Sequence, residues 1–164
     1  MLILGIDPGT ILIGYAVLET DGLHLRDCGL LKIASGARHT RLLELHEELE
    51  KLVKKWKPEA AAIEKLFFAK NVKTALEVSE ARGVLLLTTA LARLPTYEYT
   101  PLEVKKIVTG DGKADKKQLE KMVRLTLKDA RNLRAKDDVF DAIALALTCH
   151  FNERNILKSK GRTP

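Results

Sequence analysis

The sequence is poor in cysteine and in aromatic residues, and it has no long apolar segment. Only two cysteines, Cys28 and Cys149, occur in 164 residues, so a disulfide framework is excluded and reduced thiols in the cytoplasm are expected. The longest later apolar stretch, residues 83–91, is far shorter than the ~20 residues of a membrane span, and no signal peptide is evident. We therefore expect a soluble cytoplasmic protein without a membrane partner.

Proline and glycine are also scarce, with 5 and 10 copies, whereas hydrophobic residues make up 46% of the chain and charged residues 30%. These proportions exclude a disordered or collagen-like chain and are typical of a globular protein with a packed core. The length fits one domain. We expect this domain over residues 1–154, followed by a basic tail over residues 155–164.

Positive charge is unevenly distributed along the chain, whose formal net charge is +6. Residues 101–136 hold 11 Lys and Arg against 5 Asp and Glu, and residues 150–164 hold 4 against 1. The rest of the chain has a small acidic surplus, with 13 basic and 16 acidic side chains. A basic flank on a slightly acidic body indicates a polyanionic partner at one face.

Apolar periodicity predicts an α/β domain. The first 33 residues contain three short apolar runs separated by Asp7-Pro8-Gly9 and Asp21-Gly22, which indicates an antiparallel meander. Helices and strands then alternate, in the overall order βββαβαβααα. The expected strands are 2–6, 11–19, 23–33, 59–64 and 96–99. The expected helices are 38–56, 71–92, one that ends near residue 110, 115–128 and 137–154. The expected N-caps of the second, fourth and fifth helices are Asn71, Asp115 and Asp137. This order predicts a mixed five-stranded sheet with helices on both faces.

Four acidic residues occupy positions where the core has no structural use for them. Asp7 ends the first buried strand, Glu64 ends the fourth, and Asp138 and Asp141 share one face of the last helix. A lone carboxylate beside buried strands is costly unless it is paired or binds a metal. A turn could explain Asp7 alone, and helix-dipole stabilisation could explain Asp138 alone, but a metal site explains the whole set better.

Carboxylates that converge repel one another unless a divalent cation neutralises them. Oxygen ligands with open coordination positions suit Mg²⁺ or Mn²⁺. Two such ions, about 4 Å apart, can activate a water molecule and stabilise the leaving oxygen in phosphodiester hydrolysis. We expect Asp7, Glu64, Asp138 and Asp141 to be the catalytic residues and to hold two ions in each active site.

Five blocks of residues together resemble one known family. They are Ile6-Asp7-Pro8-Gly9, Ile63-Glu64-Lys65-Leu66-Phe67-Phe68-Ala69-Lys70-Asn71, Ala81-Arg82-Gly83-Val84, Val104-Lys105-Lys106 and Asp138-Val139-Phe140-Asp141-Ala142. In this order, over nearly the whole chain, they resemble RuvC, the family of bacterial Holliday junction resolvases. The block around Glu64 is the most specific, because generic RNase H-like nucleases do not share it. The four carboxylates match the four acidic catalytic residues of the family, and Asp137 is an additional carboxylate beside the third.

The resemblance implies an RNase H-like fold and a homodimer. It implies paired, symmetric, Mg²⁺-dependent incisions at a four-way DNA junction in homologous recombination and repair, together with the branch-migration proteins RuvA and RuvB. The long helix at 71–92 carries Leu76, Gly83, Leu87 and Leu91. A well-buried helix would explain these residues, and a dimer interface, as in RuvC, is the alternative.

Basic and aromatic residues are the candidates for DNA contacts. The basic flank contributes Lys105, Lys106, Lys113, Lys116, Lys117, Lys121 and Arg124. A solvated helix face is the ordinary explanation, but the few acids nearby cannot pair with so many bases, so phosphate contact is favoured. RuvC has basic residues at the positions of Lys105 and Lys116. Phe67, Phe68 and Lys70 follow Glu64 in an expected loop, where a ring either joins the core or stacks on an unpaired base; the resemblance assigns stacking to Phe67.

Three alternatives to a RuvC-type nuclease remain open. The residues from Ile6 to Thr10 also resemble the first phosphate motif of actin-like sugar kinases, but those have two such domains and a second glycine-rich phosphate loop. The intact set of carboxylates argues against a non-catalytic nucleic-acid-binding protein. The YqgF-type nucleases are a nearer alternative, and the block around Phe67 favours RuvC over them.

Overall fold

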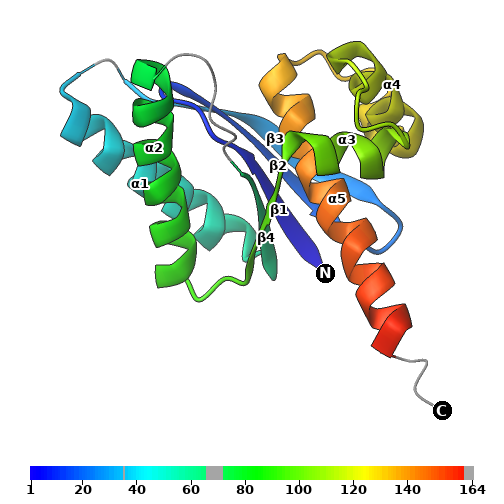
Figure 1. The fold of residues 1–164 in the computed structure, drawn as a ribbon. Coiled ribbons are helices and arrows are strands. Elements are labelled where there is room, and N and C mark those ends of the chain that lie inside the picture. The colour runs from blue at the N-terminus through cyan, green and yellow to red at the C-terminus, as the bar shows by residue number, and fades with distance from the viewer. Residues whose placement is uncertain (35, 66–71, 161–164) are drawn as a thin grey trace.

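The chain folds around a five-stranded sheet (Figure 1). The computed structural model describes residues 1–34, 36–65 and 72–160, with the side chains in these ranges except those of 72–74 and 153–160. The strands are β1 (Leu2–Asp7), β2 (Leu12–Glu19), β3 (His24–Lys32), β4 (Ala60–Glu64) and β5 (Thr96–Tyr99). Their order is β3-β2-β1-β4-β5, with β1 to β3 antiparallel and with β4 and β5 parallel to β1. The expected meander and mixed sheet are confirmed.

Helices cover both faces of the sheet, as expected (Figure 1). One face carries α1 (Arg38–Trp56) and α2 (Val72–Leu91). The other carries α3 (Pro101–Thr109), α4 (Lys116–Thr126) and α5 (Asp137–Lys160), with a short 3-10 turn, η1 (Lys128–Ala130), after α4. Of these three helices, α5 packs most extensively along β1 and β2.

Alternation along the strands divides the core into two layers. In β1, Ile6 packs on the side of α1 and α2, whereas Ile3 packs on the side of α5. In β4, Ala62 packs on the α5 side. Because side chains alternate, Asp7 and Glu64 at the ends of these two strands also point to the α5 side.

Capping residues account for where two of the helices begin. The Asp115 side chain accepts a hydrogen bond of 2.8 Å from the Gln118 backbone N–H, and the Gln118 side chain accepts one of 2.8 Å from the Asp115 backbone. This capping box confirms the predicted start of α4. Thr100 and Glu103 form the same arrangement at the start of α3.

The last helix differs from the expectation at both ends. Asp137 is the first residue of α5 rather than its N-cap, and its carboxylate lies 3.5 Å from Lys116 Nζ instead. The helix runs to Lys160 rather than ending near Arg154, because the next helix-breaking residue in the sequence is Gly161. The expected cap of α2, Asn71, lies outside the described residues.

The described part of the chain contains no helix with the length and apolar character needed to cross a membrane.

Two glycines allow α5 to approach the sheet closely. A Cβ on Gly5 of β1 would lie 2.1 Å from the carbonyl oxygen of Ala142, and a Cβ on Gly14 of β2 would lie 2.0 Å from that of Asp138. Both distances are far below van der Waals contact, so neither position admits a side chain while the helix keeps its place. Gly14 is also the register partner of Asp7. The same contact therefore sets the spacing between the start of α5 and the end of β1.

We predict that Gly14→Ala pushes the start of α5 away from the sheet. The free energy of unfolding should fall by about 1–3 kcal/mol, the usual cost of overpacking a core. Gly36→Ala is a matched control, because its Cβ would meet only the Thr40 hydroxyl, at 3.3 Å. Denaturant titrations of both variants test this, and wild-type stability of Gly14→Ala would contradict it.

Candidate active site

Asp7 and Glu64 end two adjacent parallel strands. Ile6 pairs with Ile63 in the register of β1 and β4, so the next residues, Asp7 and Glu64, lie side by side on the α5 face. The Glu64 side chain lies within hydrogen-bonding reach of the Asp7 carboxyl group. A hydrogen bond between two carboxyl groups requires one of them to carry a proton.

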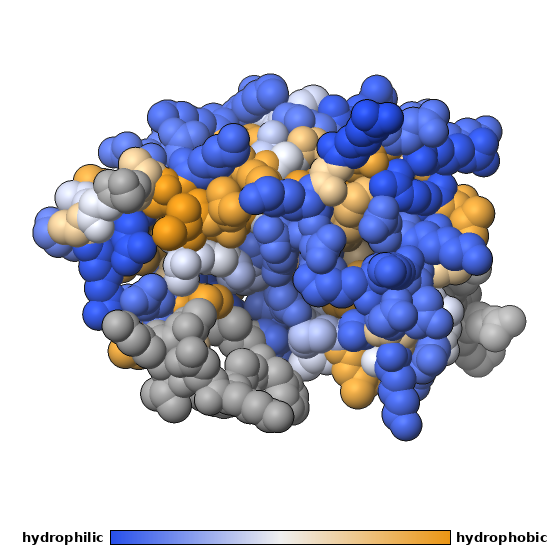
Figure 2. Space-filling model, turned by 90° about the horizontal axis from the view of Figure 1, so that it is seen from above, coloured by the Kyte–Doolittle hydropathy of each residue, from blue (hydrophilic) through white to orange (hydrophobic). Residues whose placement is uncertain are grey.

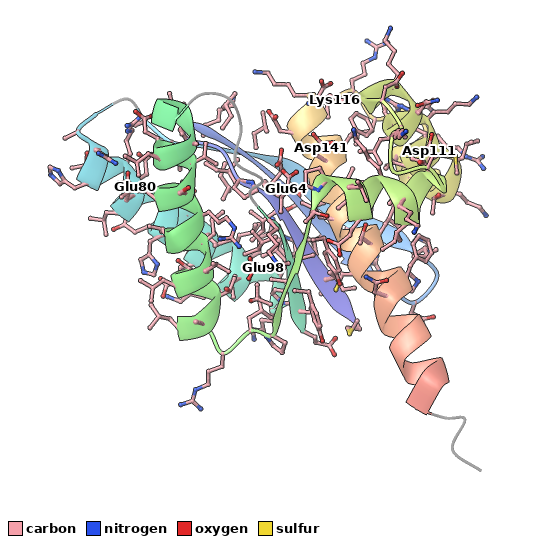
Figure 3. All side chains as sticks on the ribbon, in the orientation of Figure 1. Glu64, Glu80, Glu98, Asp111, Lys116 and Asp141 are labelled. Carbon is pink, nitrogen blue, oxygen red and sulfur yellow. The ribbon has the colours of Figure 1, made fainter. Side chains whose placement is uncertain are left out.

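Helix α5 brings the other two acidic residues to the same place. The backbone of Asp138 lies against Gly14, which pairs with Asp7 across β1 and β2. Asp141 follows three residues later and lines a pocket together with Glu64 (Figure 3). Both α5 carboxylates act electrostatically on Asp7. The four acidic residues singled out in the sequence thus lie at the same end of the sheet, close enough to influence one another electrostatically.

Burial and mutual repulsion shift the titration of these groups. Burial, the hydrogen bond with Glu64 and the negative charges of Glu64, Asp141 and Asp138 together raise the pKa of Asp7 to about 9. Burial also raises the pKa of Asp141, although the positive charge of Lys116 opposes this. In the absence of a cation, the cluster therefore holds a proton at neutral pH.

Two lysines border the pocket beside the carboxylates. The pocket has a volume of about 160 Å³ and is lined by Glu64, Pro101, Val104, Lys105, Lys116, Leu119, Asp141 and Leu145. Lys116 Nζ lies 3.5 Å from Asp137 Oδ2 and 3.5 Å from Asp141 Oδ2 (Figure 3). Burial alone would lower the pKa of Lys116, but the charges of Asp141 and Asp137 outweigh it and raise the pKa. The additional carboxylate, Asp137, is thus a counter-charge for Lys116.

The chemistry of the donor set fits a hard divalent cation. All four candidate ligands are carboxylates, which supply the oxygen donors that Mg²⁺ and Mn²⁺ prefer. A cation would also compensate the repulsion that raises the pKa of Asp7. Among the described residues, no three acidic, histidine or cysteine side chains are already grouped as a formed metal site. The fit therefore depends on the donor chemistry and on the mutual repulsion of the carboxylates.

The other expected DNA contacts are distributed around this site. Lys106 on α3 and Lys113 before α4 are exposed. Lys117 lines a separate open hollow on the outer side of α4, so it does not border the pocket with Lys116. Seen toward the carboxyl ends of β1 and β4 (Figure 2), hydrophilic side chains dominate on the side of α4, and a hydrophobic patch lies on the side of α1 and α2.

Phe67, Phe68 and Lys70 lie outside the described residues. Their expected contacts with DNA stay predictions from the sequence.

The contacts of Arg124 differ from the phosphate contact expected for it from the sequence. Its guanidinium donates to the Glu120 carboxylate and to three main-chain carbonyl oxygens, those of Ala130, Arg131 and Leu133, at distances of 2.6–3.0 Å. The guanidinium carbon also lies 4.7 Å from the centre of the Phe140 ring. These contacts occupy the guanidinium donors, so Arg124 holds the segment after α4 in place.

Arg82 and Glu98 form an ion pair at the end of β4 that the sequence analysis did not assign to the site. Arg82 also donates to the main-chain carbonyl oxygen of Glu64, at 3.2 Å. Arg82 belongs to one of the blocks that resemble RuvC, but no local pattern connects it to Glu98. The sheet register brings Glu98 beside Ile63, next to Glu64.

Solved structures share this arrangement of sheet and helices. The "Thermus thermophilus RuvC structure" matches with a TM-score of 0.85 and 28% identity, over 94% of this chain and 97% of that one. "T. thermophilus RuvC in complex with Holliday junction substrate" matches with a TM-score of 0.86 and 30% identity, over 94% and 96%. The yeast mitochondrial Holliday junction resolvase Ydc2 matches with a TM-score of 0.68 at 14% identity and shows the fold alone. The fold is RNase H-like, and the two RuvC structures indicate the nucleases of this fold as the class to which the protein belongs.

Sequence comparisons identify the family within this class. The profile described as "Crossover junction endodeoxyribonuclease RuvC" matches residues 3–150. Curated relatives of that name include one from Roseiflexus sp. (strain RS-1), 52% identical over 90% of this chain and 88% of its own. Another, from Chloroflexus aurantiacus, is 48% identical over 92% of each chain. The chain belongs to the RuvC family of crossover junction endodeoxyribonucleases, which decides against the sugar-kinase and YqgF-type alternatives.

We predict that the ion-free protein loses stability as the pH rises, because of Asp7. An unfolded aspartate titrates near 3.8 and Asp7 in the folded protein near 9, so the folded state binds the extra proton between these values. The stabilisation is complete below the unfolded pKa and decreases as the pH rises toward the folded pKa. Asp7→Asn should therefore exceed wild type in stability by on the order of a few kcal/mol at about pH 8, and not at about pH 4.

Denaturant titrations in EDTA across this pH range measure the effect. Asp21→Asn, in an exposed turn, is a matched control that should keep the wild-type pH dependence. Parallel pH profiles for wild type and Asp7→Asn would contradict the prediction.

Proposed function

We propose that this protein resolves four-way DNA junctions by paired, symmetric hydrolysis of two strands, with two Mg²⁺ ions in each active site, in homologous recombination and repair. The observation that carries the proposal is the meeting of four carboxylates at one end of the sheet, beside Lys105 and Lys116. Membership in the RuvC family and the match to a RuvC solved with a Holliday junction substrate support junction DNA as the substrate.

The carboxylates and the lysines have separate tasks in this proposal. Asp7, Glu64, Asp138 and Asp141 would hold the two Mg²⁺ ions, and Mn²⁺ should also be accepted. The ions, when bound, activate a water molecule and stabilise the leaving oxygen. Lys105, at the edge of the same pocket, attracts the phosphate backbone.

Lys116 has a different partner before and after ions bind. In the ion-free protein it neutralises Asp137 and Asp141. Compensation of the Asp141 charge by a cation would free the ammonium group for a DNA phosphate, while Asp137 keeps it near the pocket. This role agrees with the basic residue that RuvC has at the matching position.

Further DNA contacts are proposed at Lys106, Lys113 and Lys117, which are exposed around this site. The proposal for Phe67, Phe68 and Lys70 is supported by the sequence resemblance alone. Beyond residue 154 the chain adds three basic residues and no acidic one, which agrees with a tail that lies near DNA.

A homodimer would place two active sites on one junction. On α2, Leu76, Leu87 and Leu91 are 56%, 58% and 66% exposed, and they share a helix face with Gly83. A row of exposed leucines is typical of an interaction surface, and a two-fold axis suits a substrate with two symmetric cleavage points. The association with RuvA and RuvB is supported by the resemblance alone.

We predict that Asp7→Asn and Glu64→Gln each lower the rate of junction cleavage by about 10²- to 10³-fold, the usual cost of losing transition-state electrostatic stabilisation. Binding should persist, because it depends on the basic flank. The measurement incubates each protein and Mg²⁺ with a synthetic four-way junction and with linear duplex, and maps the nicks. Junction binding is followed separately by gel shift in EDTA at low salt.

Symmetric nicks on the junction alone support the proposal. Wild-type cleavage by either variant would refute the assignment of these residues, and equal nicking of linear duplex would refute the specificity for junctions.

We predict that Leu87→Glu raises the dimer dissociation constant by at least about tenfold, because a buried charge would replace an apolar contact. Leu125→Glu on α4, where the leucine is 63% exposed, is a matched control and should leave self-association unchanged. Sedimentation over a range of concentrations measures both. A wild-type protein that stays monomeric at all concentrations would refute the dimer.

A further inference from the structure

Arg82 reaches Glu64 from the face of the sheet opposite the carboxylate cluster. It belongs to α2, which lies on the side of α1, whereas the Glu64 side chain points to the α5 side. Arg82 Nε donates to the Glu64 carbonyl oxygen at 3.2 Å, and Arg82 Nη2 pairs with Glu98 Oε2. The Arg82 side chain is only 19% exposed, so this contact is sheltered from competing water.

The peptide group that follows Glu64 is held at both of its polar atoms. Its carbonyl oxygen accepts from Arg82, and its N–H, that of Lys65, donates to the carbonyl oxygen of Tyr99 at 2.8 Å. Tyr99 is the register partner of Glu64 and ends β5. Both contacts fall at the last residue of β4, where the ladder would otherwise fray.

Glu98 is the group that keeps Arg82 in this position. It lies on β5 opposite Ile63, one residue before Tyr99, and its ion pair with Arg82 places it on the face of the sheet that α2 covers. A planar guanidinium can hold a carboxylate with one nitrogen and a carbonyl with another, whereas the ammonium of lysine is a single point charge. The arrangement thus depends on arginine and not on positive charge alone.

We propose that Arg82 is a positioning residue for Glu64: it fixes the main chain at the end of β4 so that the Glu64 carboxylate stays beside Asp7. This inference rests on the proposed function, in which Glu64 is a metal ligand. An ion pair that only joins α2 to β5 would need no contact with the Glu64 main chain. The additional hydrogen bond is what connects α2 to the active site.

Three variants separate positioning from stability. Arg82→Lys keeps a charge that can pair with Glu98 but loses the separate nitrogen that reaches the Glu64 carbonyl oxygen, so kcat for junction cleavage should fall by about 10- to 100-fold with KM unchanged. Glu98→Gln leaves an oxygen that can hold Arg82, so its loss of kcat should be smaller. Arg38→Lys is the matched control, because Arg38, at the start of α1, pairs with Glu80 of α2 and does not line the pocket of the candidate active site.

The thermal unfolding midpoint and Mn²⁺ binding, the latter followed by the electron paramagnetic resonance signal of the free ion, are measured on the same variants. The proposal expects Arg82→Lys to unfold within a few degrees of wild type and Arg38→Lys, yet to bind Mn²⁺ more weakly than either. Wild-type kcat and Mn²⁺ binding for Arg82→Lys would overturn it. A loss of activity that only follows the unfolding midpoint, and that Arg38→Lys reproduces, would also overturn it.

The same measurements distinguish failure of the inference from failure of the proposed function. If wild type does not cleave the junction, the proposed function fails, and weaker Mn²⁺ binding by Arg82→Lys still supports the positioning role. If wild type cleaves and Arg82→Lys matches it in kcat and in Mn²⁺ binding, only the positioning role fails.

Discussion

The close contact between α5 and the glycines of β1 and β2 is the constraint on which the active site depends. Because Gly5 and Gly14 have no side chains, the backbone of α5 lies directly on the sheet. This contact sets the spacing between Asp138 and Asp7, since Gly14 touches the first residue and pairs with the second. Any side chain at Gly14 would move the helix outward and separate the Asp7 and Asp138 carboxylates, which in the proposed function hold the same ions.

Because the carboxylates lie close together they repel one another, and three kinds of positive charge can compensate this repulsion. A proton stabilises the Asp7 and Glu64 pair, and its presence follows from the raised pKa of Asp7. Lys116 compensates Asp141, with Asp137 as a further neighbour. In the proposed function, divalent cations would be the third counter-charge, and they would displace the proton and free the lysine. Repulsion among the carboxylates lowers the stability of the ion-free protein. In the proposed function the same repulsion favours ion binding, so stability and function place opposite demands on these residues.

Much of the fold and of the candidate site could be predicted from local sequence. Short apolar runs bounded by turn or polar residues located the strands, and the carboxylates at the ends of two of them had no explanation within the core. The predicted cap residue, Asp115, located the start of α4, and the structure adds Gln118 as its reciprocal partner. The end of α5 was predicted less well, because the periodic pattern weakens after Arg154 although no helix-breaking residue occurs before Gly161.

The sequence by itself determined the elements, the two-sided sheet, the acidic set and the basic flank, because strand alternation and helix periodicity are local properties. Only the tertiary structure decided which charges meet. Lys116 pairs with Asp137 and Asp141, the Arg124 guanidinium binds groups of its own chain, and Arg82 binds both Glu98 and the main-chain carbonyl oxygen of Glu64. The pairs of Lys116 and Arg82 join residues of different elements, and their contacts follow from strand register and from how deeply a helix packs on the sheet.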